Sequence, residues 1–156
     1  MPLELDLGLA WQRVRRYTTF VDQKDDHRLL DVNTDGWLEG LNARLAAEYQ
    51  VGECQICKVP KAGGDFRPGA VLSTDDAVAY TALVGRYYPE IRAAFGELAS
   101  NQVDIANRLQ PDPRALNWIT NDVSTWGEFR EKSLDSLDGC QFVVISDIAG
   151  FYENID

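Results

Sequence analysis

The stretch VPKAGGDFRPGAVLSTDD (Val59–Asp76) decides the fold of this chain, because it contains two extended runs, a glycine turn and the start of a helix. The runs CQICKVPK and FRPGAVL flank the sequence Ala-Gly-Gly-Asp. Gly63 and Gly64 can adopt a positive φ at low cost, so we predict a β-hairpin. Ser73 and Asp76 have the spacing of a capping box. The sequence therefore predicts a hairpin that leads directly into a helix.

Apolar residues at helical spacing occupy much of the remaining chain. They predict helices over about 7–20 and 36–49, a long helix that begins at 73, and a further helix over 121–137. Pro89 predicts a kink or a break in the long helix near Tyr88. The polar, turn-rich segment 21–36 is predicted as a loop, and Phe142–Ile145 as a strand. We therefore expect an α+β fold, rich in helix, with a β-hairpin and a terminal strand.

Composition limits the class of protein. The 156 residues are 45% hydrophobic, which is sufficient for one domain with a real core. A formal net charge of −10 counts against a broad nucleic-acid-binding surface, although a local basic site is compatible with it. No apolar run approaches the length that spans a bilayer, and the N-terminus does not resemble a signal peptide. Three cysteines suggest reduced thiols, so we expect a cytoplasmic protein with no membrane partner.

The segment DVNTDGWLEGLN partly matches a calcium-binding loop. Asp31, Asn33, Asp35 and Gly36 occupy positions 1, 3, 5 and 6 of an EF-hand loop, but position 12, which should be a bidentate carboxylate, is Asn42. Asp, Asn and Gly are also the residues that a polar turn before a helix would use. A degenerate, EF-hand-like calcium site therefore remains an alternative.

The pair Cys54 and Cys57 forms a CxxC sequence, which is half of a common zinc site. The remaining candidate ligands, Cys140 and His27, show no paired spacing. Two cysteines at this spacing near a strand are more often small buried apolar residues, which is our interpretation here.

The predicted hairpin carries two cations, Lys61 and Arg67, on either side of its glycine turn. Together they would suit a polyphosphate, with lysine as a point charge and arginine as a fork. A loop of two or four residues would pair Lys61 with Phe66 and place Arg67 on the opposite face, whereas a three-residue loop would pair Lys61 with Arg67. The alternative is an exposed hairpin with solvated charges.

The chain ends with FVVISDIAGFYENID (Phe142–Asp156). Its apolar run lacks alternation, as expected for a central strand covered on both faces. Asp147 follows that strand, where a carboxylate can face a cleft and hold a divalent metal. The alternative is that Asp147 caps a helix that begins near Ala149.

Taken together, these features resemble the first half of a reverse transcriptase. The motif sequences are most similar to those of bacterial defence-associated, abortive-infection-type members. The sequence Asp147–Tyr152, DIAGFY, resembles the first palm motif of that family. The sequence VPKAGGDFRPG resembles its fingers signature, Pro-Lys-x-x-Gly-x-x-Arg-Pro, which is followed by an Asp-containing helix. The resemblance implies the fingers and the start of the palm of a right-hand polymerase.

The resemblance also implies roles for five residues. Asp147 would bind the catalytic Mg²⁺ ions, with Mn²⁺ as a possible substitute, and Ile148 would assist through its backbone carbonyl. Lys61 and Arg67 would contact the incoming deoxynucleoside triphosphate. Tyr152 would act as a steric gate that excludes the ribose 2′-hydroxyl.

The implied activity is RNA-directed DNA synthesis, a two-metal nucleotidyl transfer on a template–primer in an antiviral defence role. A complete site also needs an aromatic-x-Asp-Asp motif and a thumb, and neither follows Asp147 here. We therefore expect an N-terminal helical segment (1–50), a fingers-like region (51–139) and a truncated first palm motif (140–156), inactive without the C-terminal palm and thumb. The alternative is a non-catalytic α+β interaction module.

Overall fold

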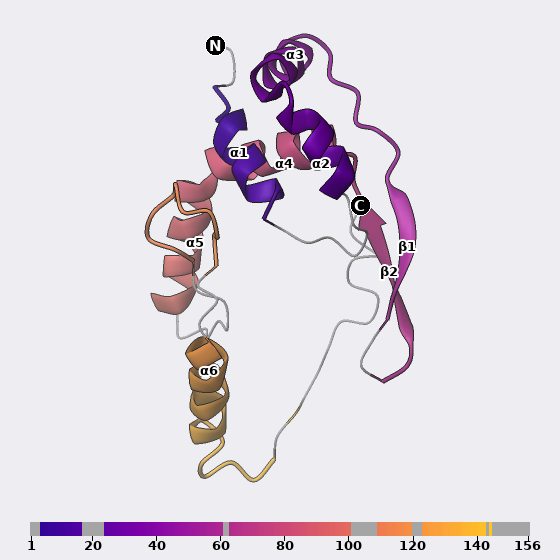
Figure 1. The fold of residues 1–156 in the computed structure, drawn as a ribbon. Coiled ribbons are helices and arrows are strands. Elements are labelled where there is room, and N and C mark those ends of the chain that lie inside the picture. Colours follow the sequence, from indigo (N-terminus) through magenta and orange to yellow (C-terminus); the bar gives the residue numbers. More distant parts are fainter. Residues whose placement is uncertain are drawn as a thin grey trace.

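The computed structural model describes residues 4–16, 24–60, 63–100, 109–119, 123–142 and 144. The fold is α+β and rich in helix, with one two-stranded antiparallel hairpin among the described residues (Figure 1). Its elements are α1 (Leu7–Val14), α2 (Lys24–Asp31), α3 (Thr34–Ala46), β1 (Gln55–Pro60), β2 (Phe66–Val71), α4 (Thr74–Arg86), α5 (Tyr88–Ser100) and α6 (Val123–Asp135).

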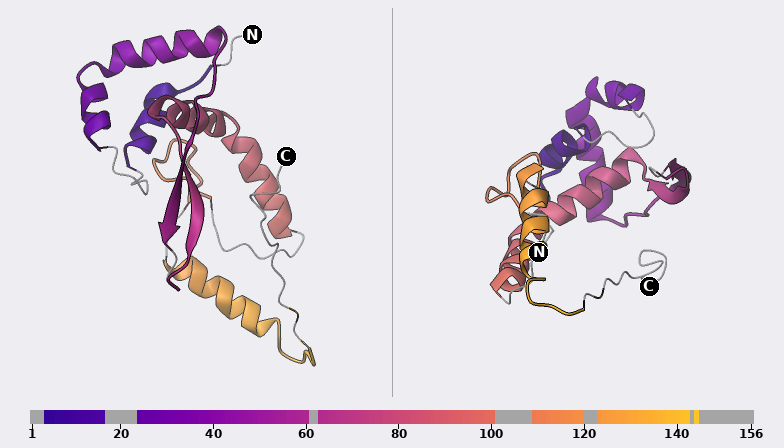
Figure 2. Two further views of the ribbon diagram at one scale, coloured as in Figure 1. Left: turned by 90° about the vertical axis from the view of Figure 1, so that its right-hand side faces the viewer. Right: turned by 90° about the horizontal axis from the view of Figure 1, so that it is seen from below.

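The hydrophobic core lies where α1, α3 and α4 meet. The α1 helix packs along α4, and α2 and α3 lie beside this pair (Figures 1 and 2). The Trp11 ring makes edge-on contacts with His27 of α2 at 5.1 Å and with Trp37 of α3 at 4.9 Å between ring centroids. Residues from both sides of position 50 thus contribute to one core, whose buried members are Leu7, Ala10, Trp11, Leu41, Val78 and Ala82.

Arg13, at the end of α1, fixes the irregular segment 109–119 against the helices. Only 2% of Arg13 is exposed. Its guanidinium donates to the carbonyl oxygens of Pro113 (2.6 Å) and Ala115 (2.9 and 3.1 Å), and it lies 4.5 Å from the centre of the Trp118 ring. The hydroxyl of Tyr88 on α5 lies 3.1 Å from the Trp118 carbonyl oxygen. A buried guanidinium needs such partners, so these contacts hold 109–119 in place without a helix or strand.

Several helices differ from their predicted bounds. The predicted loop 21–36 was wrong, because α2 occupies Lys24–Asp31. Leu30 of α2 packs against the core, and this tertiary contact outweighs the polar composition of the helix. The described part of the first helix ends at Val14 rather than at 20. The predicted break near Tyr88 is confirmed: α4 ends at Arg86 and α5 begins at Tyr88.

The predicted terminal strand is not formed at its described residues. Phe142 and Val144 are 87% and 89% exposed, and neither belongs to a strand. A buried strand needs neighbouring strands to pair with, and the two strands that the structure describes pair only with each other. The prediction of a covered central strand was therefore wrong for Phe142 and Val144, while Val143 and the residues from 145 onward lie outside the described residues.

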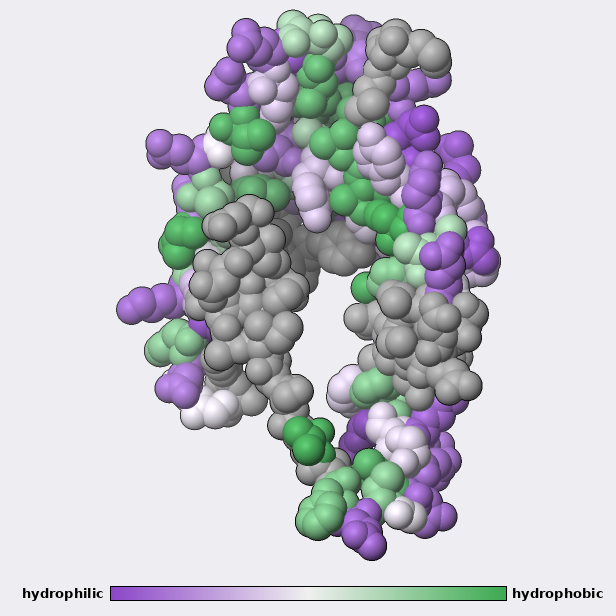
Figure 3. Space-filling view, turned by 180° about the vertical axis from the view of Figure 1, so that it is seen from behind, coloured by the Kyte–Doolittle hydropathy of each residue, from purple (hydrophilic) through white to green (hydrophobic). Residues whose placement is uncertain are grey.

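Apolar side chains are also exposed on the surface of the molecule. In the view from behind, hydrophobic residues are scattered among polar ones, including at the lower end, over α6 and the residues that follow it (Figure 3). Trp126 and Leu134 on α6 are 57% and 62% exposed, and Leu137, just after that helix, is 38% exposed. None of the described helices has the length and apolar character required to cross a bilayer.

Candidate functional site at the hairpin

The predicted β-hairpin is confirmed, but its register differs from the alternatives that we considered. Cα partners run from Gln55 with Val71 to Pro60 with Phe66, so Arg67 lies opposite Val59. Five residues, 61–65, connect the last pair, so the predicted loop lengths of two, three and four residues were all wrong. Pro60 has no N–H to donate to the ladder, which favours an end to the pairing at this residue.

The register fixes the face on which Arg67 lies. Side chains directly opposite each other in an antiparallel pair share a face, so Arg67 is on the face of Val59, which is 4% exposed. Arg67 itself is exposed. Lys58 lies opposite Pro68, on the other face. The hairpin therefore carries one described cation on each face.

The glycine turn behaves as predicted at one of its two glycines. Gly64 has a φ of +89°, the left-handed region that glycine adopts at least cost, whereas Gly63 has no such φ. Lys61 lies outside the described residues, and so do Asp147, Ile148 and Tyr152. Of the cationic and catalytic residues predicted from the sequence, the structure therefore places Arg67 alone.

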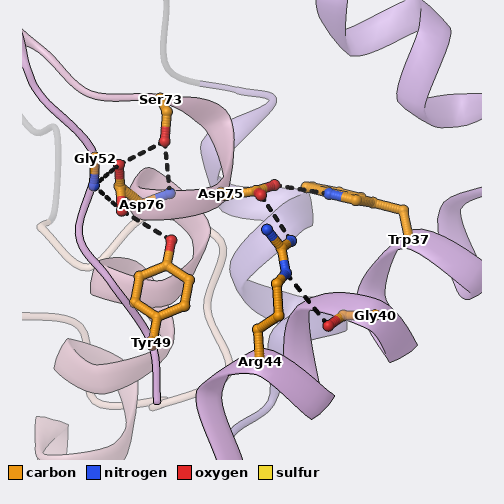
Figure 4. A network of polar contacts seen from close by, with 8 residues as sticks. All are labelled: Trp37, Gly40, Arg44, Tyr49, Gly52, Ser73, Asp75 and Asp76. Carbon is orange, nitrogen blue, oxygen red and sulfur yellow. Dashed lines mark hydrogen bonds and ion pairs between the residues drawn. The ribbon is translucent and has the colours of Figure 1, made fainter. Parts of the chain in front are cut away.

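A cluster that we call the hairpin junction (Tyr49, Gly52, Ser73 and Asp76) lies at the base of the hairpin (Figure 4). The Asp76 carboxylate accepts hydrogen bonds from the Ser73 hydroxyl (2.5 Å), the Tyr49 hydroxyl (2.8 Å) and the Gly52 N–H (3.2 Å). The Ser73 hydroxyl in turn accepts a bond from the Asp76 N–H at 3.1 Å. Gly52 precedes β1 and Ser73 follows β2, so a single carboxylate connects both ends of the hairpin to α4.

Burial and hydrogen bonding act in opposite directions on the Asp76 carboxyl. Burial alone would raise its pKa, but hydrogen bonds from Ser73, Tyr49 and Gly52 outweigh that effect and lower the pKa below its usual value. Burial, together with the hydrogen bond to Asp76, raises the pKa of Tyr49 to about 12. Gly52 is required for the close approach, because a Cβ there would lie 2.9 Å from an Asp76 oxygen.

The neighbouring carboxylate, Asp75, connects α4 to α3 instead. It accepts a hydrogen bond from the Trp37 indole N–H (2.8 Å) and forms an ion pair with Arg44 (2.7 Å). Both residues lie on α3 (Figure 4). Asp75 and Asp76 both lie in the first turn of α4, where negative charge interacts favourably with the helix dipole. The first turn of α4 is thus the point at which the hairpin and α3 are joined.

Sequence reasoning identified Ser73 and Asp76 only as a helix cap. It missed the bonds from Tyr49 and Gly52, which come from residues more than twenty positions earlier in the chain. The signal in the sequence was the pair of adjacent aspartates, Asp75 and Asp76. A helix cap requires only one polar partner, so the second carboxylate indicated an additional contact.

The geometry at the predicted calcium loop is that of two helices. The Asn33 side chain accepts a hydrogen bond from the Gly36 N–H (3.2 Å) and caps α3, which begins at Thr34. Asp31 forms an ion pair with Arg15 at 2.8 Å. Asp31 therefore lies in α2 and Asp35 and Gly36 lie in α3, with only a short turn at 32–33 between the two helices.

The CxxC cysteines do not form a metal site in the described part of the chain. No group of three or more His, Cys, Asp or Glu side chains there could hold a metal ion. Cys54 is exposed and Cys57 is half-buried, so the prediction that both are buried apolar residues was wrong for Cys54.

Comparison with known proteins found no matching family, no matching curated protein and no matching solved structure.

Proposed function

We propose that the chain is the fingers and first palm motif of an RNA-directed DNA polymerase. The observation that carries the proposal is that the sequence Pro60-Lys61-x-x-Gly64-x-x-Arg67-Pro68 coincides with a β-hairpin. The hairpin turns through Gly64 and runs directly into an Asp-containing helix, α4. This arrangement supports the resemblance of the stretch to the fingers signature.

In this proposal the hairpin binds the triphosphate of a deoxynucleotide. Arg67 supplies a planar fork of N–H donors for phosphate oxygens, and Lys61 supplies a compact positive charge. These cations would neutralise charge that develops as the phosphoryl group is transferred. The position of Arg67 relative to α4 depends on the hairpin junction, which connects both ends of the hairpin to that helix.

The remaining roles belong to the terminal motif. Asp147 and the Ile148 carbonyl would hold Mg²⁺ or Mn²⁺, which would supply Lewis-acid activation of a primer 3′-hydroxyl and charge neutralisation at the phosphates. Tyr152 would act as the gate against a ribose 2′-hydroxyl. These assignments come from the resemblance of DIAGFY to the family motif. The complete enzyme would use a template–primer, with a downstream palm and thumb, in a bacterial defence role.

Nucleotide binding tests the proposal directly. A fluorescent deoxynucleoside triphosphate with Mg²⁺ is titrated against the chain, against Arg67→Ala and against Lys58→Ala, and fluorescence anisotropy is measured. Lys58→Ala is the matched control, because it removes an equal charge from the opposite face of the same hairpin. We expect Arg67→Ala to weaken binding by about ten-fold or more, and Lys58→Ala by less than about two-fold.

Equal effects of the two substitutions would mean that the hairpin attracts the nucleotide only through net charge, and the triphosphate site would then be rejected. A parallel primer-extension assay should give no product with this chain alone, because the second acidic motif is missing from it. Robust primer extension would show that the expectation of an incomplete active site in this chain is wrong.

The second candidate is a non-catalytic interaction module. It is favoured by exposed apolar residues on the hairpin itself, where Ile56 is 71% and Phe66 is 61% exposed. Such residues are typical of a surface that contacts another protein. This candidate predicts no measurable binding of the triphosphate probe by the wild-type chain.

A further inference from the structure

A groove lies between the N-terminal part of the chain, α3 and α4, and its described lining residues include none from the hairpin strands. Its volume is about 990 Å³. Besides the buried Leu7, four leucines contribute apolar surface to it: Leu5 before α1, Leu38 and Leu45 on α3, and Leu83 on α4. The first three pack partly against the core, and Leu83 is 37% exposed. The groove is therefore an apolar surface built directly on the core.

The edges of the groove are acidic. Glu4, Asp35 and Glu39 line it and are exposed, and its described lining residues include neither lysine nor arginine. Within the part of the chain that the structure describes, these three carboxylates take part in no ion pair. Side chains that are already neutralised would contribute little attraction to a partner, whereas these three can attract a positively charged one.

The wall supplied by α3 extends along most of that helix. Its lining residues recur at helical spacing from Asp35 to Ala46, so they form one stripe along the helix. The eleven steps between residues Asp35 and Ala46, at the rise of an α-helix, correspond to a length of roughly 16 Å, or about three turns. A groove of this length, apolar along its floor and charged along its edge, suits a helix that lies in it with its apolar face inward.

We propose that this leucine groove binds an amphipathic helix of a partner protein, with leucine-like residues on one face and lysine or arginine along the flanks. Charge complementarity selects this occupant, because three exposed carboxylates line the space that the flanks would fill. A second copy of this chain is disfavoured, since its own formal charge is −10. The proposal is independent of nucleotide binding at the hairpin.

The test uses three synthetic fluorescent peptides about four turns long. The first has leucine at every third or fourth position with lysine on the flanks. The second has glutamate in place of every lysine, and the third has the composition of the first in scrambled order. Each peptide is titrated against the full chain at low and high salt, with fluorescence anisotropy as the readout. We expect the lysine peptide to bind with a Kd of about 10 µM, and at least about ten-fold more tightly than either other peptide.

Charge reversal distinguishes this groove from general electrostatic attraction. The double variant Glu4→Lys/Glu39→Lys reverses two exposed rim charges, and Glu48→Lys/Glu53→Lys changes the net charge equally at exposed positions outside the groove. We expect the rim variant to lose about ten-fold in affinity for the lysine peptide and to gain affinity for the glutamate peptide. The control variant should change either affinity by less than about two-fold.

Three outcomes would overturn the proposal. Equal effects of the two double variants would indicate non-specific attraction of a basic peptide to an acidic chain. Unchanged binding by Leu83→Asp, a groove residue exposed enough for the substitution to be tolerated, would place the peptide elsewhere. A dimer in sedimentation equilibrium that Leu83→Asp dissociates would assign the groove to a second copy of the chain.

Discussion

Replacing Asp76 with asparagine should destabilise the chain by removing a charge from the hairpin junction while it leaves the shape of the side chain unchanged. In the wild-type protein the carboxylate is 6% exposed and accepts bonds from Ser73, Tyr49 and Gly52. An amide can keep this geometry if its oxygen faces Gly52 and Ser73. Its nitrogen then faces Tyr49, whose hydroxyl can accept instead of donate.

The magnitude follows from the difference between charged and neutral hydrogen bonds. A bond to a charged group contributes about 1 kcal/mol more than a neutral one, so three bonds at the Asp76 carboxylate correspond to about 3 kcal/mol. Because the amide of asparagine is neutral, the variant does not pay the desolvation cost of a buried charge, and this offsets part of the lost hydrogen-bond energy. We therefore expect Asp76→Asn to lower the free energy of unfolding by about 2 kcal/mol at pH 7.

The effect of Asp76→Asn should depend on pH. The folded-state pKa of Asp76 is lowered, so the carboxylate stabilises the fold above its unfolded pKa of about 3.9. That stabilisation is lost as the pH falls through the lower, folded-state pKa. The wild-type chain and the variant should therefore converge in stability in strong acid, where both side chains are neutral.

Urea unfolding followed by tryptophan fluorescence measures this difference, with Asp65→Asn in the hairpin loop as the control for loss of charge. Hydrogen exchange supplies a local readout, since the Gly52 amide should lose protection of about 30-fold in the variant. A stability difference that persists unchanged in strong acid would contradict the electrostatic explanation. Unchanged protection of Gly52 would contradict the assigned hydrogen bond.

Three further substitutions test other parts of the structure. Arg13→Lys keeps the charge but loses the fork that donates to two carbonyls, so urea unfolding should show a loss of about 2 kcal/mol. Tyr49→Phe should cost about 1 kcal/mol at pH 7. The folded-state pKa of Tyr49 is raised to about 12, so its contribution to the free energy of unfolding is complete below its usual pKa of about 10 and is lost as the pH rises through the folded-state value. Unfolding measured at increasing alkaline pH should show this loss in the wild-type chain and not in Tyr49→Phe. Gly64→Ala should cost about 1 kcal/mol because of its φ of +89°, whereas Gly63→Ala should be nearly neutral in thermal unfolding.

The elements that could be predicted from sequence depend on a few neighbouring residues. The positive φ of Gly64, the cap at Ser73 and the helix break before Tyr88 each follow from local stereochemistry. The hairpin was predictable for the same reason, because its turn residues and its two extended runs are adjacent in the chain.

The features that could not be predicted depend on contacts between distant residues. Arg13 was indistinguishable in sequence from the neighbouring surface arginines, yet it is buried because carbonyl groups about one hundred residues later receive its hydrogen bonds. The helix α2 is polar, and it is stabilised by the packing of Leu30 against the core, which depends on the tertiary structure. The register of the hairpin was equally open, since it depends on where Pro60 ends the ladder. The part of the candidate site at Asp147 lies beyond the described residues.

The hairpin junction also explains how a two-stranded sheet can serve as a stable platform. An isolated hairpin is marginally stable in water, and this one has exposed apolar residues along much of its length. Only Val59 and Val71 among its strand residues are buried, so side-chain burial alone offers little support. The Asp76 carboxylate compensates by holding both ends of the hairpin at one point on α4. This reduces the length of chain between fixed points, and with it the conformational entropy that must be lost to form the hairpin. A cation on β2, such as Arg67, is thereby positioned relative to the helical core.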